Sequence, residues 1–467
     1  MDLTTYLSGD AWRLWAALSI TFAYTLFCYV LFHRARNAGQ ITVMQQGTGK
    51  PVLVVYASQT GQAESIARHT ASELSGNGTP VHLSRIDQPW LEDAASASRV
   101  FFIVSTAGDG SSPDHALGFV HKQLDKPCAG LQGVRFGLLA LGDRNYPDFC
   151  AFGRRLDQWL QACGAQPEFS RIEVDKLEGQ ALAAWNGHLQ GFGTKIQAGA
   201  PAATEPDDYA EWRLLSRCCL NAGSPGSSMC KVVLQPVSGG LPQWHAGDLA
   251  DVLIPGGDGK PRSYSISNLP DDNRIELIVR SVVREDGTSG QTSGWLNQHA
   301  QPGDALKLRV RSNPGFNLGA DLSKPLILIG AGTGIAGLRG HLQARAKAFS
   351  ASAQPAPEHN TWLLFGERSG RHDRPCHAEI DKWQHTRLLT RLDLSFSRDD
   401  PRTPYVQHHL QEHAKELQEW VENGANILVC GCAKTMARSV DQSLRNILGD
   451  ASVDDLLMSG RMRRDIF

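Results

Sequence analysis

A turn rich in polar side chains follows an apolar run at residues 52–56 and precedes apolar residues at helical spacing. The turn consists of Ser58, Gln59, Thr60, Gly61, Gln62 and Ala63. At the start of a helix, backbone N–H groups and the helix dipole attract an anion, and hydroxyl groups replace part of its hydration. The turn is therefore a candidate phosphate site, although an ordinary capped helix start fits it equally well. It lacks the G-K-[ST] sequence of a Walker loop, which argues against a nucleoside triphosphate.

Two further apolar runs, residues 100–104 and 136–141, also end in loops rich in glycine and polar residues. Ligands of open parallel α/β sheets bind at the carboxyl ends of the strands, where all three loops would meet. The candidate residues of these two loops are Ser105, Thr106, Ala107, Gly108, Leu141, Gly142, Asp143, Asn145, Tyr146, Phe149 and Cys150. The acids of this region are either a patch for a basic partner or solvated loop residues, namely Asp109, Asp114, Asp143 and Asp148.

The heptapeptide R-S-Y-S-I-S-N at residues 262–268 combines a cation, an aromatic ring and serines. In a strand, Arg262, Tyr264 and Ile266 would share one face and the serines the other. Such a strand alone does not indicate a ligand site. Its context is more informative, because G-A-G-T-G-I-A-G-L-R-G follows at residues 330–340 and the chain ends in R-R-D-I-F.

Together these segments resemble the diflavin reductases, the family that includes cytochrome P450 reductase and the sulfite reductase flavoprotein. In this family a flavodoxin-like half is joined to a half of the ferredoxin–NADP⁺ reductase type. The resemblance implies that the first three loops bind FMN. Ala107 stands where an aromatic residue often stacks on the flavin, so Tyr146 is expected to be the single stacking partner.

For the second half, the resemblance implies that Arg262 pairs with the pyrophosphate of FAD, Tyr264 lies against the flavin ring and Ser265 lies near its hydride-accepting nitrogen. The residues that correspond to the FAD site are Arg262, Ser263, Tyr264, Ser265, Ile278, Val279, Arg280, Gly290, Gln291, Thr292 and Ser293. Ser265, Cys430 and Asp465 are expected to surround the hydride path, with Phe467 as a lid over the flavin. The alternative for Phe467 is a side chain that merely packs on the barrel.

The expected nicotinamide cofactor is NADPH. Its ribose phosphate is a dianion, which a serine and an arginine can bind through charge-assisted hydrogen bonds, and Ser397-Arg398 matches the family at this position. The corresponding NADPH residues are Gly332, Thr333, Gly334, Arg368, Ser397, Arg398, Tyr405 and Gln407. The chain departs from the family pattern at Gly337, Thr403 and Cys432.

Composition sets wide limits. A chain of 467 residues with 41% hydrophobic residues should form two or three globular domains. A net charge of −2 gives no electrostatic case for nucleic acid binding. The ten cysteines lack the spacing of a zinc site or a disulfide framework, so we expect reduced thiols, as in the cytosol, and no metal.

Residues 14–32 carry no formal charge and are about long enough to cross a hydrocarbon core. We expect an uncleaved membrane anchor with the remaining domains cytoplasmic, because a cleaved signal peptide needs a basic N-terminal region that this chain lacks.

The expected fold class is multidomain α/β. It comprises an N-terminal transmembrane helix, a flavodoxin-like doubly wound parallel sheet, an antiparallel FAD-binding β-barrel and an α/β NADP-binding domain. The expected boundaries are 1–36 for the anchor, 37–50 for a tether, 51–198 for the FMN domain, 199–210 for a linker, 211–320 for the barrel and 321–467 for the NADP domain. Arg262 follows Pro201 by only 61 positions, which leaves no room for the helical insertion found in the P450 and sulfite reductases.

The expected function is a relay of electrons from NADPH through FAD and FMN to a one-electron acceptor, with a haem protein as the first hypothesis. Ferric iron or a siderophore at the membrane is the second. A sulfite reductase component is the third, because that flavoprotein has no anchor and carries the insertion. A non-enzymatic redox sensor is a further alternative, and it predicts very slow turnover with every acceptor.

Overall fold

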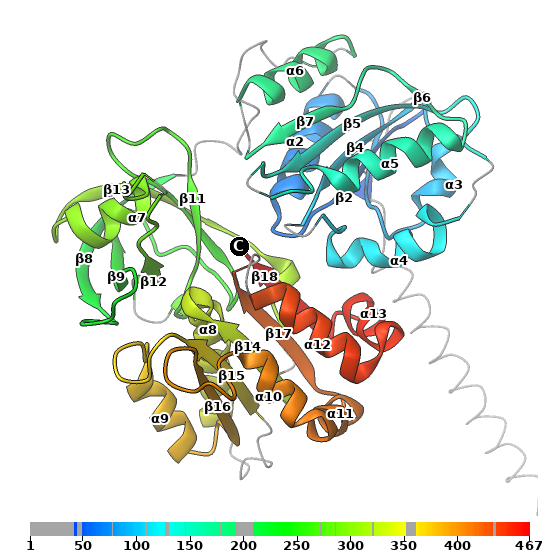
Figure 1. Ribbon diagram of the computed structural model, residues 1–467. Coiled ribbons are helices and arrows are strands. Elements are labelled where there is room, and N and C mark those ends of the chain that lie inside the picture. Colours follow the sequence, from blue (N-terminus) through cyan, green and yellow to red (C-terminus); the bar gives the residue numbers. More distant parts are fainter. Residues whose placement is uncertain are drawn as a thin grey trace, which may run out of the picture.

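The computed structural model describes residues 42–43 and 49–467, apart from 77, 108–109, 127–129, 145, 177–178, 193, 195–208, 271–272, 285, 320–321, 352–360 and 433–435. Three sheets organise these residues (Figure 1). The predicted anchor at residues 14–32, most of the tether and nearly all of the linker lie outside the described residues.

The first sheet has seven strands in the order β1-β3-β2-β4-β5-β6, with β7 also paired to β5. All its pairings are parallel except that of β1 with β3. Its strands are β1 (Thr42–Val43), β2 (Val52–Ala57), β3 (Val81–Arg85), β4 (Arg99–Ser105), β5 (Arg135–Gly142), β6 (Gln166–Pro167) and β7 (Ile172–Asp175). The helical segments of this half are α2 (Gln62–Ser75), α3 (Trp90–Ala94), η1 (Asp114–Ala116), α4 (Leu117–Phe119), η2 (Val120–Leu124), α5 (Ala151–Ala162) and α6 (Gly179–Gln190).

Helices cover both faces of this sheet, which explains why its central strands read as continuous apolar runs. Every residue of β2 is buried. Leu53 and Val55 belong to one core with α3 and α5, whereas Val54 and Tyr56 belong to a second core with α2 and α6. The first sheet therefore has the predicted doubly wound, flavodoxin-like form.

The second sheet is antiparallel, with the strand order β11-β10-β13-β8-β9-β12. A bridge between Ile266 and Leu277 joins the two end strands, so the sheet closes on itself there. Its strands are β8 (Ala210–Cys219), β9 (Met229–Pro236), β10 (Leu249–Leu253), β11 (Arg262–Ser265), β12 (Ile275–Arg280) and β13 (Ala305–Arg311). The associated short helices are α7 (Gln291–Gly294), η4 (Trp295–His299) and η5 (Pro314–Phe316).

The third sheet is parallel and has the strand order β16-β15-β14-β17-β18. Its strands are β14 (Leu326–Ala331), β15 (Thr361–Glu367), β16 (Arg391–Phe396), β17 (Asn426–Gly431) and β18 (Met462–Ile466). Its helices are η6 (Gly332–Gly334), α8 (Ile335–Ala351), α9 (His377–His385), α10 (Val406–Glu412), α11 (Ala414–Glu422), α12 (Arg438–Leu448) and α13 (Asp450–Met458). The C-terminus, after β18, lies where the three sheets approach one another (Figure 1).

The predicted membrane location requires a correction. No helix within the part of the chain that the structure describes is both long enough and apolar enough to cross a bilayer. No helix that the structure describes therefore supports the predicted membrane anchor and membrane location, while the predicted parallel α/β sheets and the antiparallel sheet are confirmed.

Candidate functional site

The polar turn after β2 is held against the end of β4. Ser105 Oγ accepts a hydrogen bond from the backbone N–H of Gln59 at 3.2 Å and lies 3.3 Å from the Ala57 carbonyl oxygen. Gly61 precedes α2 with φ of 82°, a left-handed conformation that favours glycine. Ser58 Oγ accepts the N–H of Ala63, in the first turn of α2, at 3.2 Å.

The loops after β4 and β5 lie beside this turn, because β2, β4 and β5 are neighbours with parallel register. Thr106 Oγ1 is buried and has no hydrogen-bond partner among the described residues. A polar atom of this kind fits a site that binds a polar group. Tyr146 is partly buried, and burial raises the pKa of its hydroxyl, with smaller contributions from Asp143 and Cys432.

Not every predicted FMN residue presents its side chain to this site. Cys150 is buried in the core, its thiol donates to the Ala140 carbonyl at 3.3 Å, and burial raises its pKa to about 12. Cys150 would therefore contribute to a ligand site only through its backbone. This backbone lies against Gly142, where an added Cβ would be 2.9 Å from Cys150 N. Gly108 and Asn145 lie outside the described residues.

Three predicted hydride-site residues from separate strands meet at one point. Ser265 Oγ, at the end of β11, donates to Asp465 Oδ2 at 2.8 Å, and Cys430 Sγ of β17 lies 3.7 Å from the same oxygen. Burial raises the pKa of Asp465, while the hydrogen bond from Ser265 opposes the shift. Burial and the charge of Asp465 also raise the pKa of Cys430, so the thiol stays protonated. The cluster thus contains a buried carboxyl group that can retain a proton.

Gly337 of α8 closes one side of this cluster. A Cβ at this position would lie 3.1 Å from Phe316 Cε1, 3.2 Å from Cys430 Sγ and 3.7 Å from Ser265 Cβ. A Cβ at these distances would require its neighbours to move by a few tenths of an ångström, so glycine lets the helix approach this closely without such a shift. The departure from the family pattern at this position therefore lies directly beside the predicted hydride site.

The predicted FAD residues come from β11 and β12, the two end strands of the antiparallel sheet, and from the start of α7. Arg262 donates to Asp258 at 2.9 Å, Ser263 Oγ donates to Asp251 at 2.6 Å, and burial raises the pKa of Tyr264. The side chains of Ile278 and Val279 belong to cores, so only their backbone could face a ligand.

The predicted second pyrophosphate loop lies at the start of α7. Ser293 Oγ accepts the N–H of Val282 at 3.1 Å, Gly290 is the N-cap of α7, and Gln291 and Thr292 are its first two residues. Arg280 is paired with Glu367 of β15, whose pKa is raised by burial. This pair lies near Gly332, where a Cβ would be 3.8 Å from Arg280 Nη2. It therefore links the antiparallel sheet to the glycine-rich turn after β14.

The predicted NADPH residues lie at the carboxyl ends of the third sheet. Gly332, Thr333 and Gly334 follow β14, Arg368 follows β15, and Ser397 and Arg398 follow β16. Tyr405 precedes α10 and has 54% of its surface exposed, and Gln407 lies in the first turn of that helix. Gly334 packs directly on the backbone of Cys430, so the turn and the hydride-site cluster are in contact. These positions agree with the general location of ligands in parallel sheets.

Phe467, the last residue, donates its N–H to the Gly431 carbonyl at 3.1 Å, while 47% of its surface is exposed. It is therefore not packed in the interior of the antiparallel sheet. Its predicted role as a lid stays a prediction.

No pattern in the sequence indicated the contacts that join the first half to the other two sheets. Gln59 Nε2 donates to the Arg464 carbonyl at 3.3 Å and to Asp114 Oδ2 at 3.0 Å. Arg464 forms an ion pair with Asp114, and Arg311 donates to the Thr60 carbonyl. The residues that pair between the first half and the other two sheets are hundreds of positions apart, so no local pattern could reveal them.

Comparison with known proteins identifies the two α/β regions. Residues 54–185 match the flavodoxin family, and residues 328–442 match the oxidoreductase NAD-binding domain family. The sulfite reductase [NADPH] flavoprotein alpha-component of Bacillus subtilis (strain 168) is 25% identical over an alignment that covers 90% of this chain and 89% of the relative. That of Vibrio vulnificus (strain CMCP6) is 25% identical, with coverages of 93% and 88%.

The chain is therefore a flavoprotein oxidoreductase that combines a flavodoxin domain with an NAD-binding oxidoreductase domain. This combination and the named relatives support the diflavin reductase family, which the sequence motifs predicted. The predicted cofactors, FMN, FAD and NADPH, are confirmed by the two domain matches and the relatives. The alignment with the Bacillus subtilis relative extends over 550 positions, more than the 467 residues of this chain, so this chain lacks segments that the relative contains.

Proposed function

We propose that this NADPH-dependent diflavin reductase passes electrons from NADPH through FAD and FMN to a one-electron acceptor, in the first place a haem protein. The main support is the contact of Gln59 with Arg464 at 3.3 Å, because Arg464 immediately precedes Asp465 in β18. The predicted FMN turn and the predicted hydride site are therefore adjacent, as transfer between two flavins requires.

The nicotinamide and the flavins supply the hydride and electron chemistry, and the protein supplies position, charge and a proton. In this proposal Ser265 and Cys430 orient the Asp465 carboxyl through Oδ2. The raised pKa of Asp465 favours the protonated form of this carboxyl, which could exchange its proton during turnover. Gly337 allows α8 to pack closely beside Cys430 and Ser265, which fixes the positions of both side chains in the cluster.

Selection of NADPH is assigned to the loop after β16. Ser397 is partly exposed and Arg398 is exposed, so both could reach a phosphate from solvent. Tyr405, on the adjoining segment, offers an exposed ring to the adenine. The position that is often lysine in the family is Thr403, whose hydroxyl donates to Asp400 at 2.8 Å. Arg398 is therefore the main proposed source of positive charge.

A second candidate is the flavoprotein component of a sulfite reductase. It is favoured by the relatives, since those of Bacillus subtilis and Vibrio vulnificus carry that name and align over about nine tenths of this chain. An argument against this candidate is that the chain lacks segments that the Bacillus subtilis relative contains. The ferric chelate and redox sensor hypotheses have no specific observation in their favour.

The test uses the purified full-length chain with FAD and FMN. We expect NADPH to drive reduction of both ferricyanide, which can take electrons from FAD, and cytochrome c, with only the cytochrome c activity lost when FMN is removed. Ferricyanide reduction without cytochrome c reduction would exclude the haem-protein relay. Sulfide production after addition of a sulfite-reducing haem protein would favour the second candidate.

A further inference from the structure

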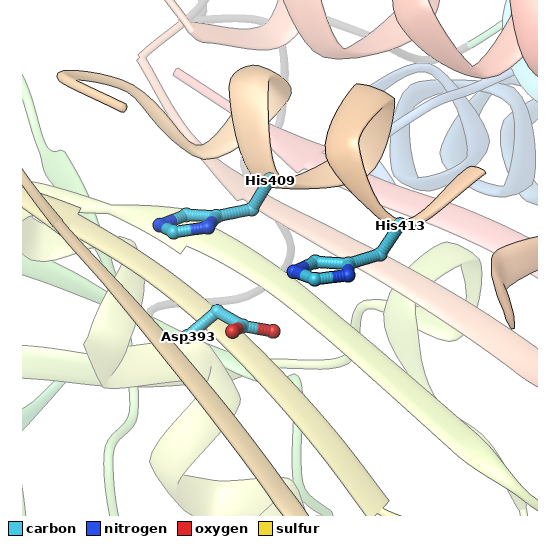
Figure 2. Close-up of side chains that lie close together, drawn as sticks. All are labelled: Asp393, His409 and His413. Atoms are coloured by element: carbon cyan, nitrogen blue, oxygen red, sulfur yellow. The ribbon is translucent and has the colours of Figure 1, made fainter. Parts of the chain in front are cut away.

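A cluster of potential metal ligands lies in the third sheet, away from the hydride-site residues. Asp393 comes from β16, His409 from α10, and His413 from the junction of α10 and α11. Their ligand atoms all lie within 4.8 Å of one another. Figure 2 shows the two imidazole rings side by side, with the Asp393 carboxylate next to them.

The hydrogen bonds of His409 leave a nitrogen available for a metal ion. His409 Nε2 lies 3.4 Å from the Leu394 carbonyl, and since a carbonyl only accepts, Nε2 must carry the proton in this bond. In the neutral ring, Nδ1 then has a free lone pair. Nδ1 is buried and has no hydrogen-bond partner among the described residues. A metal-bound histidine commonly donates its other N–H to a backbone carbonyl in this way.

A second carboxylate lies beside both rings. Glu412 Oε2 is 3.9 Å from His409 Nδ1 and 4.0 Å from His413 Nε2. Two imidazoles and carboxylate oxygens form a donor set that suits Zn²⁺. Ligand bonds of about 2.0–2.2 Å place neighbouring donors roughly 3.5 Å apart, so the side chains would have to move together by roughly 1 Å.

The surrounding charges allow a cation despite one neighbouring guanidinium. Arg391 donates to Asp393 Oδ2 at 2.7 Å, and Trp362 Nε1 donates to the same oxygen at 2.6 Å. Oδ1 has only a long contact of 3.5 Å with Arg391. The Arg391 guanidinium also pairs with Glu416, so its charge is shared between two carboxylates. Asp393 Oδ1 therefore remains able to coordinate an ion.

We propose that Asp393, His409 and His413 bind a divalent transition-metal ion of the Zn²⁺ type, with Glu412 as a fourth ligand. The ion joins β16 to α10 and fixes these two elements relative to each other. β16 leads to Ser397 and Arg398, and α10 begins after Tyr405. The ion thus holds the two elements that flank residues 397–405, the loop proposed to bind the NADPH phosphate. This consequence rests on the proposed NADPH roles of those residues, whereas ion binding itself does not.

The first experiment measures bound Zn²⁺ directly, without NADPH, by equilibrium dialysis of the flavin-loaded chain and elemental analysis. We compare the wild type with His409→Ala and His413→Ala. The control is His385→Ala, which removes an exposed histidine of α9 in the same domain. We expect the wild type and the control to bind one ion more per chain than the two cluster variants. Equal stoichiometry in all four proteins would overturn the site.

The second experiment tests the effect of the ion on the fold. Because a ligand that binds only the folded state raises its stability, Zn²⁺ should raise the Tm of the wild type and of His385→Ala, but not that of His413→Ala. His413 is the more exposed of the two histidines, so its replacement leaves the core intact even if His409→Ala fails to fold. Zn²⁺ should also lower the KM for NADPH in the same two proteins. Bound Zn²⁺ that changes neither Tm nor KM would overturn the link between β16 and α10.

Discussion

Arg464 of β18 and Asp114 of η1 form an ion pair between the third sheet and the flavodoxin half. Arg464 Nε donates to Asp114 Oδ1 at 3.0 Å, and the two side chains are only 14% and 13% exposed. Asp114 also receives a hydrogen bond from Gln59. The sequence analysis left Asp114 either in an acidic patch for a basic partner or as a solvated loop residue, whereas in the structure it binds an arginine of its own chain.

Asp114→Asn should weaken the contact between the two halves. Removing one member of a largely buried pair costs about 2 kcal/mol or more, which is a shift of more than tenfold in the population of the closed arrangement. We expect slower electron transfer from FAD to FMN, with FAD reduction by NADPH unchanged, in stopped-flow measurements. Arg463→Ala is the control, since Arg463 donates within its own domain to Gly460 at 2.8 Å. Equal effects of both substitutions would contradict the assignment.

Asp465→Asn should slow flavin reduction and also change how the free energy of unfolding depends on pH. Burial raises the pKa of Asp465 in the folded state, so ionisation of this group disfavours folding. Its contribution to stability is fully present below its unfolded pKa and is lost as the pH rises through its folded pKa. As the pH rises through this folded-state pKa, the free energy of unfolding of the wild type should therefore fall relative to that of the variant, which denaturant unfolding measures. NADPH-driven flavin reduction in the variant should be slower by on the order of 100-fold. A pH-independent stability difference would contradict the shifted pKa.

Gly337→Ala and Gly340→Ala form a matched pair on α8. Each removes a glycine from the helix, which favours helix formation by about 0.5–1 kcal/mol. A Cβ at Gly340 meets its nearest atom, the Ile266 carbonyl oxygen, at 3.4 Å, whereas one at Gly337 lies 3.2 Å from Cys430 Sγ. We expect Gly340→Ala to raise Tm without changing turnover, and Gly337→Ala to slow NADPH oxidation several-fold. Normal hydride transfer in Gly337→Ala would show that the close packing of α8 on Cys430 is not required.

Tyr146→Ala and Tyr405→Ala should have complementary effects on the cofactors. Loss of a stacking ring costs about 1 kcal/mol beyond its buried area, so Tyr146→Ala should weaken FMN binding by about tenfold and leave the KM for NADPH unchanged. Tyr405→Ala should raise the KM for NADPH and leave FMN bound. Flavin fluorescence after dialysis and steady-state kinetics measure the two effects, and each variant is the control for the other. Loss of FMN from both would point to general destabilisation instead.

Much of the fold could be predicted because parallel strands covered on both faces read as apolar runs, as in residues 52–56 and 326–329. The rule that ligands bind at the carboxyl ends of such strands then indicated the loops that matter. The meeting of Ser265 with Asp465 needed the family resemblance, since the two lie 200 positions apart.

Other features could not be predicted, for reasons that differ. The pairing of Arg464 with Asp114 depends on how two separately folded units dock, which no local pattern encodes. The metal-ligand cluster could be seen only in part. His409 and His413 are four positions apart, as neighbours on one helix face are, but two histidines alone do not indicate a metal site. Their partner Asp393 became apparent only when β16 was placed beside α10.

The order of residues in β18 has a thermodynamic consequence. Arg464, which contacts the flavodoxin half, and Asp465, which belongs to the hydride-site cluster, are adjacent in one short strand, and their side chains point to opposite faces. A shift of this strand changes both environments at once. By linkage, if nucleotide binding favours closure of the two halves by some factor, closure must strengthen nucleotide binding by the same factor. The two halves would then act as reciprocal effectors, with one peptide bond as the shortest path between them.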